Sequence, residues 1–422
     1  MLDVIGRLTT RHAWWVVAFW TAALAALILT RQDPFITLLG VPGPGLPGAV
    51  GSGLLGGYGP VPGGGGGMVA AGVVLFALAA VLRSPLAVPL ALLAAVAVHG
   101  MSAVVVSALG LPAPPALFAY GTALGCAVMM VHRFKERLSS GDGPAVAVQT
   151  CLDRVGPVVA TAYAAWTVSC GALPLGAGTR GLGPALAVTA SAGILVALTL
   201  LPALLTVLAP LLAWPSRRRP GPRKGRPSGP RKGGTRLGLA VAAHPAAWTP
   251  VAAGLILAMG ATGPVLVPAP LPAAVVAVAG VLVALVLALV LRSLVSPAYV
   301  ASGALLVAWA AGTTAARPGD QLAVFMFTLA VTVSTALLVL ARVREATGTG
   351  RDPRTSSALA IKYAGPPALA ALLVAGTLAA TVYDVLSGVC LVAGGAALSL
   401  VVVPGLTAML GTRAWWPDTA PA

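Results

Sequence analysis

Residues able to carry protons or form bonds are scarce in the apolar parts of this sequence. None of the ten acidic residues falls in the middle of an apolar run, and no GxxxxGK[ST], HExxH or GxSxG pattern occurs. One titratable group remains inside such a run: His99, in VAVHGMSAV. It could carry protons, because histidine titrates near neutral pH. The alternative, which we favour, is a neutral ring hydrogen-bonded to the backbone or to Ser102. We therefore expect no enzyme, no cofactor and no metal site.

The sequence contains one stretch twice, because residues 83–157 and 292–366 align at a constant offset of 209 without a gap. The matching anchors are Arg83-Ser84 with Arg292-Ser293, Arg133 with Arg342, Glu136 with Glu345, Pro144 with Pro353, and Gly156-Pro157 with Gly365-Pro366. One offset at several separated anchors indicates an internal duplication. Two copies of a multi-helix membrane unit are the layout of many transporters.

The composition excludes a soluble globule. Hydrophobic residues make up 58% of the chain, the mean hydropathy is +0.95, and only 9% of residues are charged, against about 25% in soluble domains. The net charge of +16 would suit a nucleic-acid partner, but its placement between apolar runs argues against one. The cysteines show no CxxC spacing, and we interpret those within apolar runs as small core residues rather than ligands: Cys126, Cys170 and Cys390.

Twelve apolar segments predict an all-α polytopic membrane protein built from two parallel six-helix repeats, since a span needs roughly 20 apolar residues. The segments are 13–30, 68–82, 86–110, 115–131, 157–176, 181–210, 238–262, 273–291, 296–316, 321–341, 363–383 and 386–411. The count falls to eleven if 68–82, or 238–262 with its His244, Pro245 and Pro250, does not span. We expect 13–30 to be a retained helix, because its apolar stretch exceeds the roughly 7–15 residues of a cleaved signal.

Basic residues set the predicted orientation in a cell (plasma or inner) membrane. With alternating loops, all of the 26 Lys and Arg residues except Arg31, Arg180 and Arg317 fall on the side of both termini, which the positive-inside rule makes cytoplasmic. The first repeat is then 1–213, with a disordered Gly/Pro-rich outside loop at 31–67. A basic linker, 214–236, precedes the second repeat, 237–422. The loops 132–156 and 342–362 could each hold a short helix along the inner surface.

Several motifs resemble a known family. The motifs are LRSPLA, VHRFKER, RVGPVVATA and LTLLPALLTVL, which recur as LRSLVSP, ARVRE, YAGPPALAA and VVVPGLTAML. In this order they resemble the MmpL branch of the resistance–nodulation–division superfamily. The resemblance implies two six-helix halves around a pseudo-two-fold axis along the membrane normal. It also implies proton-driven export of lipids or hydrophobic compounds.

The chain departs from that family in two ways. The family's large extracytoplasmic domains are replaced by the loop 31–67 and by about ten residues at 263–272. The family also has an Asp-Tyr proton relay eight and seven residues before the arginine that closes the fourth helix of each half. Those positions hold Gly125 and Cys126 before Arg133, and Ser334 and Thr335 before Arg342. We call these four residues the relay positions, and we expect no proton coupling through them.

Two functions follow from this pattern. The first is a transport-type protein that moves or admits a lipid or other hydrophobic substrate without proton coupling, alone or driven by a partner. The alternative is a non-transporting membrane subunit or scaffold. The first predicts a polar path between the halves near Cys126 and Thr335, and the second predicts closed packing there. Expected partners are membrane lipid, a hydrophobic or lipid substrate, and accessory or oligomeric membrane proteins, with no nucleic acid.

Overall fold

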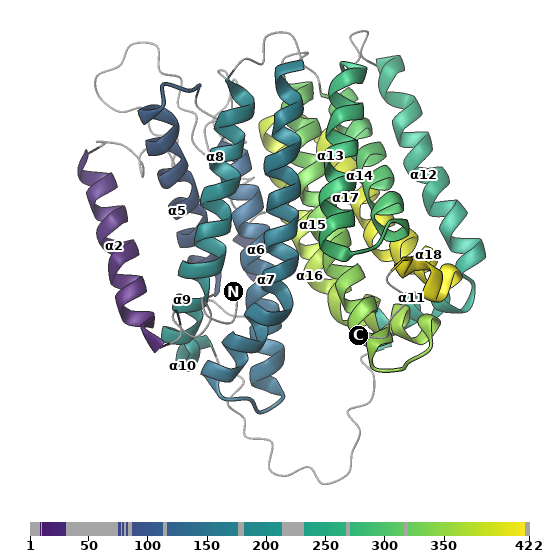
Figure 1. Cartoon of the computed structure of the whole chain (residues 1–422), viewed down its shortest axis with the longest axis horizontal. Coiled ribbons are helices and arrows are strands. Elements are labelled where there is room, and N and C mark those ends of the chain that lie inside the picture. The colour runs from purple at the N-terminus through teal and green to yellow at the C-terminus, as the bar shows by residue number, and fades with distance from the viewer. Residues whose placement is uncertain are drawn as a thin grey trace.

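The computed structural model describes residues 11–30, 87–112, 116–175, 181–212, 232–266, 271–315 and 320–417, together with residue 9 and five positions between 75 and 82. Within these residues the chain is a bundle of roughly aligned helices without a named β-strand (Figure 1). In the part of the chain that the structure describes, eight helices are long and apolar enough to cross a membrane, and one bent pair would make nine. The predicted all-α polytopic class is confirmed. The loop 31–67 and most of the predicted span 68–82 lie outside the described residues.

The helices of the first repeat follow the predicted apolar segments. They are α2 (Ala13–Thr30), α5 (Ala87–Ala108), α6 (Ala116–Ser139), α7 (Pro144–Ser169), η1 (Cys170–Leu175), α8 (Leu182–Leu195), η2 (Val196–Leu200), α9 (Leu201–Val207) and α10 (Ala209–Leu212). Helices form here because a backbone in lipid must satisfy its own N–H and C=O groups. Segments α8, η2 and α9 together make one span.

The second repeat has the same order. Its helices are α11 (Lys232–Ala243), α12 (Pro245–Leu266), α13 (Ala273–Leu291), α14 (Val295–Thr313), α15 (Gln321–Gly348), α16 (Pro353–Val382), α17 (Val385–Ala397), η3 (Leu398–Val402), α18 (Val403–Leu410) and η4 (Gly411–Trp415). The last five residues of the predicted linker 214–236 already belong to α11, and the rest of it lies outside the described residues.

The duplication is visible in three dimensions. Lys135 donates a hydrogen bond to the carbonyl of Leu82 at 2.5 Å, and Arg344 donates one to the carbonyl of Leu291 at 3.0 Å. The two bonds are equivalent, because Arg344 and Leu291 lie 209 positions after Lys135 and Leu82. The sixth span of each repeat also contains a π-helical turn, η2 or η3, at an offset of 202. The offset falls because the connection before the sixth span is shorter in the second repeat.

The segment predicted as the span 238–262 is not one straight helix. Helices α11 and α12 meet at His244 with a bend of 104°. The cause is Pro245, which opens α12. Proline has no N–H to donate and is tolerated in the first turn of a helix but not in its interior without a break.

The prediction of separate surface helices in 132–156 and 342–362 is wrong. Pro144 and Pro353 do open helices, but α7 and α16 run on without interruption as 26-residue and 30-residue helices. Most of the apolar face of the first segment is buried in the bundle, including Val148 and Cys151, whereas Val146 is exposed. These residues therefore extend the fifth span instead of lying on a membrane surface.

The two repeats meet along four helices. Helix α6 packs against α16, and α15 packs against α7, so that α6, α7, α15 and α16 surround the line between the repeats (Figure 1). Helix α15 is almost entirely buried, whereas α13 presents most of its side chains outward. The four central helices therefore position any site on the axis between the repeats.

Candidate functional site on the axis between the repeats

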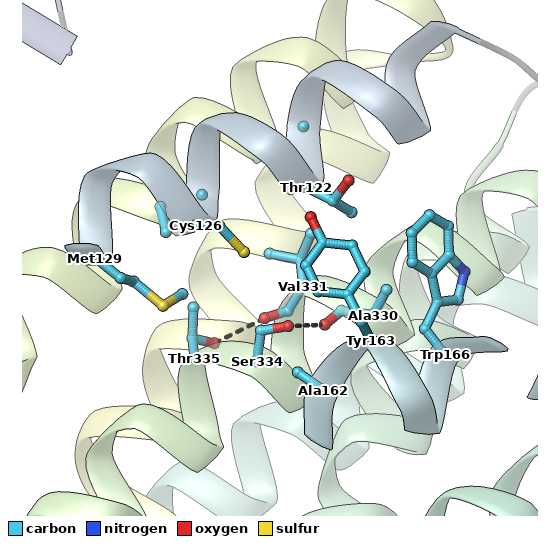
Figure 2. A pocket seen from close by; sticks show the side chains of 13 residues that line it. Thr122, Cys126, Met129, Ala162, Tyr163, Trp166, Ala330, Val331, Ser334 and Thr335 are labelled. Carbon is cyan, nitrogen blue, oxygen red and sulfur yellow. Dashed lines mark hydrogen bonds between the residues drawn. The ribbon is translucent and has the colours of Figure 1, made fainter. Parts of the chain in front are cut away.

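The relay positions lie together in the structure. Gly125 and Cys126 on α6 and Ser334 and Thr335 on α15 line one hollow, which we call the relay hollow (Figure 2). The cavity volume of the relay hollow is about 20 Å³, which is room for about one water molecule. The structure thus brings the four positions into contact with a single small space.

The hydroxyls at the relay positions are bonded to the backbone. Ser334 Oγ donates to the carbonyl of Ala330 at 2.7 Å. Thr335 Oγ1 lies 3.1 Å from the carbonyls of both Val331 and Thr332. Such bonds to the preceding turn are the usual arrangement for Ser and Thr inside helices. The hydroxyls of Ser334 and Thr335 are thereby satisfied within α15.

A phenol absent from the sequence prediction enters the relay hollow from α7. Tyr163 is buried, and its ring points between Thr122 and Cys126 (Figure 2). Its hydroxyl lies near the side chains of Thr122 and Cys126 but makes no well-aligned hydrogen bond to either. The 209 offset pairs Tyr163 with Leu372, so the repeat gave no signal for a polar group there.

A glycine on the sixth span makes room for the Tyr163 ring. A Cβ atom built on Gly193 would lie 2.7 Å from Cζ and 2.8 Å from the hydroxyl oxygen of Tyr163. The second repeat has the same arrangement, because a Cβ on Gly395 would collide with Leu372. Each repeat therefore packs a large side chain of its fifth span against a glycine of its sixth.

Aromatic rings close the bundle beyond the relay hollow. Trp166 stacks on Phe118 with ring centroids 5.6 Å apart, and Phe118 meets Phe327 edge-on at 5.6 Å. All three side chains are buried. Phe118 and Phe327 lie near the starts of α6 and α15, about two turns before the relay positions. Packing at this end of the axis is closed.

A second hollow, which we call the charged hollow, lies nearer the other ends of α6 and α15. Its cavity volume is about 120 Å³. Its lining is Met129 with Leu338, His132 with Ala341, Arg133 with Arg342, Glu136 with Glu345, Arg154 with Tyr363, Val155 with Ala364, Val158 with Pro367, and Asp153. Each pair is related by the 209 offset, so this hollow lies on the pseudo-two-fold axis. Met129 lines both hollows.

The charged hollow contains ion pairs within and between the repeats. Within each repeat, Arg133 lies 2.7 Å from Glu136 and Arg342 lies 2.9 Å from Glu345. Between repeats, Arg342 lies 2.9 Å from Glu136, and Arg133 lies 3.5 Å from Glu345. The sequence identified these residues as repeat anchors but did not show that they meet, because alignment of a repeat does not specify contacts across its axis.

His99 stays apart from both hollows. It lies on α5, half-buried, and its ring stacks on Tyr120 with centroids 5.2 Å apart. Ser102 Oγ donates to the backbone carbonyl of His99 at 2.9 Å, so this hydroxyl bonds the main chain rather than the imidazole.

The cysteines are free thiols, and all four are buried. Among the described residues, no three His, Cys, Asp or Glu side chains gather so as to hold a metal ion. Asp320 and Asp384 occupy the N-cap positions of α15 and α17, at helix ends rather than mid-span.

These features define a class: a polytopic membrane protein of two parallel repeats, with equivalent positions of both repeats lining hollows on the axis between them. Residues 65–248 match the MMPL family. A curated membrane protein, ActII-3 of Streptomyces coelicolor, is 37% identical over 103 residues, which are 24% of this chain and 14% of that protein. The resemblance to the MmpL branch that the motifs predicted is therefore confirmed over residues 65–248, and the chain is a polytopic membrane protein similar to that family.

Solved structures share the fold. SecDF, a translocon-associated membrane protein from Thermus, matches with a TM-score of 0.54 and 15% identity over 82% of this chain and 62% of that one. SecDF in a super-membrane-facing form matches with a TM-score of 0.53 and 14% identity over 81% and 61%. The chain spans less than two thirds of the length of each of these relatives. At such low identity the likeness concerns the fold alone.

Proposed function

We propose that this protein is a transport-type membrane protein that moves or admits a lipid or other hydrophobic substrate without proton coupling. One observation carries the proposal. The relay positions face one another across the axis, yet they hold Gly125, Cys126, Ser334 and Thr335. Coupling through a bilayer needs an intramembrane group that titrates, and the hydroxyls here are bonded to helix carbonyls.

The proposed orientation places the charged ends of the helices in the cytoplasm. Arg344 reaches the end of α13 at Leu291, and Ser293 donates to the carbonyl of Ala414 beside Arg413. Basic residues of several helices therefore gather at one end of the bundle, which supports a cytoplasmic end with both termini. This position also suits contact with anionic lipid headgroups. We propose membrane lipids and accessory or oligomeric membrane proteins as partners, and neither enzymatic activity nor nucleic-acid binding.

A second candidate, a non-transporting membrane subunit, is favoured by the closed packing. The relay hollow has room for about one water, and Phe118, Phe327 and Trp166 seal the bundle beyond it. A lipid cannot pass such a centre unless the helices move apart.

The two functions differ in an experiment on reconstituted vesicles. The purified chain is placed in phospholipid vesicles with a fluorescent phosphatidylethanolamine analogue, and transbilayer movement is followed by dithionite quenching with and without an uncoupler. Transport predicts movement faster than in protein-free vesicles and unchanged by the uncoupler. Gly125→Leu is the control, because its Cβ is in ordinary contact only with Ala371 and the rest of the side chain fills the relay hollow. It should slow the movement. A wild-type rate equal to that of protein-free vesicles supports the subunit instead.

A further inference from the structure

We propose that Arg133, Glu136, Arg342 and Glu345 form an inter-repeat lock that holds the charged end of the axis closed and controls water access to the relay hollow. The proposal is independent of the substrate, since it concerns how the two repeats are held together.

One of the two ion pairs across the axis, Arg342 with Glu136, is as close as the pairs within a helix, and the other, Arg133 with Glu345, is longer at 3.5 Å. One nitrogen of Arg342 lies 3.1 Å and 2.9 Å from the two carboxylate oxygens of Glu136. Glu136 also accepts from Arg133 at 2.7 Å. Each carboxylate therefore joins an arginine of its own repeat to an arginine of the other, and the four charges form a closed ring with no net charge.

The surroundings make this ring stronger than a surface ion pair. The side chain of Arg133 is 8% exposed and that of Arg342 is 19% exposed. Charges held away from bulk water interact more strongly, and each is costly to leave without its partner. Separating the repeats at this end would therefore leave two arginines and two carboxylates half-buried and unpaired across the axis.

One further ion pair, found on one side of the axis only, supports the lock. Arg154 on α7 lies 3.1 Å from Glu345, on the opposite repeat. At the equivalent position of the second repeat the side chain is Tyr363, whose ring centroid lies 5.9 Å from the guanidinium of Arg342. Helices α6 and α7 are thus both tied to α15.

The charged hollow makes the lock reversible. Its 120 Å³ is room for several waters, and water can solvate the charges as the ring opens. Met129 lines both this hollow and the relay hollow, which Cys126 also lines. Opening the lock should therefore expose the Cys126 thiol to water.

Charge reversal can separate the effect of the ion pairs across the axis on closure from the effect of the ion pairs along each helix. The full chain carries Cys151→Ala, Cys170→Ala and Cys390→Ala, which leaves Cys126 as the reporter. It also carries Arg154→Gln, so that only the ring changes. The rate of Cys126 modification by a water-soluble methanethiosulfonate reagent is measured in lipid nanodiscs.

The first variant is Arg133→Glu with Glu136→Arg. It keeps an opposite-charge pair along α6 but sets like charges across the axis. The second adds Arg342→Glu and Glu345→Arg, which restores every pair in reversed sense with the same composition. The lock predicts that the first variant raises the Cys126 rate on the order of tenfold, and that the second returns it to within about twofold of the reference.

Two results overturn the lock: a first variant that reacts at the reference rate, or a second variant that stays as reactive as the first. Size-exclusion profiles and melting temperatures show that each variant is folded. If the first variant does not fold, Glu136→Gln replaces it, because this change removes the charge and keeps the shape of the side chain. An unchanged rate in that variant overturns the proposal equally.

Discussion

The hydroxyl oxygens of Thr335 and Ser399 lie 3.1 Å apart, one on α15 and the other on the π-helical turn η3. Both side chains are fully buried. Single π-turns within α-helices often occur at functional sites, and this one brings a sixth-span hydroxyl to a relay position. In the first repeat, Ser399 corresponds to Ala197 at the 202 offset, and Thr335 corresponds to Cys126 at the 209 offset. The polar contact therefore belongs to the second repeat alone.

This hydroxyl pair should be energetically coupled. Thr335→Val and Ser399→Ala should each lower the free energy of unfolding by about 1 kcal/mol, because each leaves a buried hydroxyl without its partner. The double variant should cost less than the two added together. Thr377→Val is the matched control: its hydroxyl bonds only the carbonyl of Leu373 on an exposed face, and it should change stability by less than about 0.5 kcal/mol. Strict additivity in detergent unfolding would contradict the contact.

Packing of the Tyr163 ring against Gly193 predicts a size-dependent defect. Gly193→Ala should destabilise the protein by roughly 1–3 kcal/mol, since the methyl group meets the ring in a filled core. Adding Tyr163→Leu, the residue type at position 372, should recover most of that loss. Gly143→Ala serves as the control, because nothing lies near its added methyl. Equal melting temperatures for Gly193→Ala and Gly143→Ala would show that the ring does not occupy this position.

The Tyr163 hydroxyl should contribute little to stability. Because it makes no well-aligned hydrogen bond to the nearby Thr122 or Cys126 side chains, Tyr163→Phe should leave the melting temperature unchanged or raise it. Tyr299→Phe should behave differently. Its hydroxyl lies 2.8 Å from Thr407 Oγ1, and losing that bond should cost about 1 kcal/mol. A clear loss of stability in Tyr163→Phe would instead reveal a partner for the phenol inside the hollow.

The parallel relation of the repeats can be tested by labelling. Ser140 and Thr349 are exposed, follow α6 and α15, and are equivalent at the 209 offset. In a cysteine-free chain, Ser140→Cys and Thr349→Cys should both react with an impermeant maleimide only from the cytoplasmic side. Val385→Cys, at the start of α17 and 66% exposed, should react only from the other side. Labelling of positions 140 and 349 from opposite faces would mean inverted repeats.

The sequence predicted features that depend on one segment or on the repeat. Apolar runs located α13 at 273–291, where the structure has it, and the shared offset identified Cys126 and Thr335 as equivalent positions. It did not predict the Tyr163 ring in the relay hollow or the pairing of Arg342 with Glu136. Those contacts join separate helices, and helix rotation is set by packing that hydropathy does not record.

Two local errors have physical causes of the same kind. The apolar run at 238–262 concealed the bend at Pro245, because hydropathy averages over a residue that breaks the helix. The segment after Pro144 looked amphipathic, but neighbouring helices cover most of its apolar face from Val148 onward. In both cases the neighbouring helices decided the outcome.

The central claim is that proton flux does not drive this protein, and one measurement tests it most directly. The chain is reconstituted into vesicles with an imposed pH gradient, and accumulation of a fluorescent hydrophobic probe is followed alongside the internal pH. The account predicts that the protein adds no proton leak and that an uncoupler leaves probe movement unchanged. Accumulation that collapses with the uncoupler and is abolished by His99→Ala would contradict it, and would show that the relay has moved to α5.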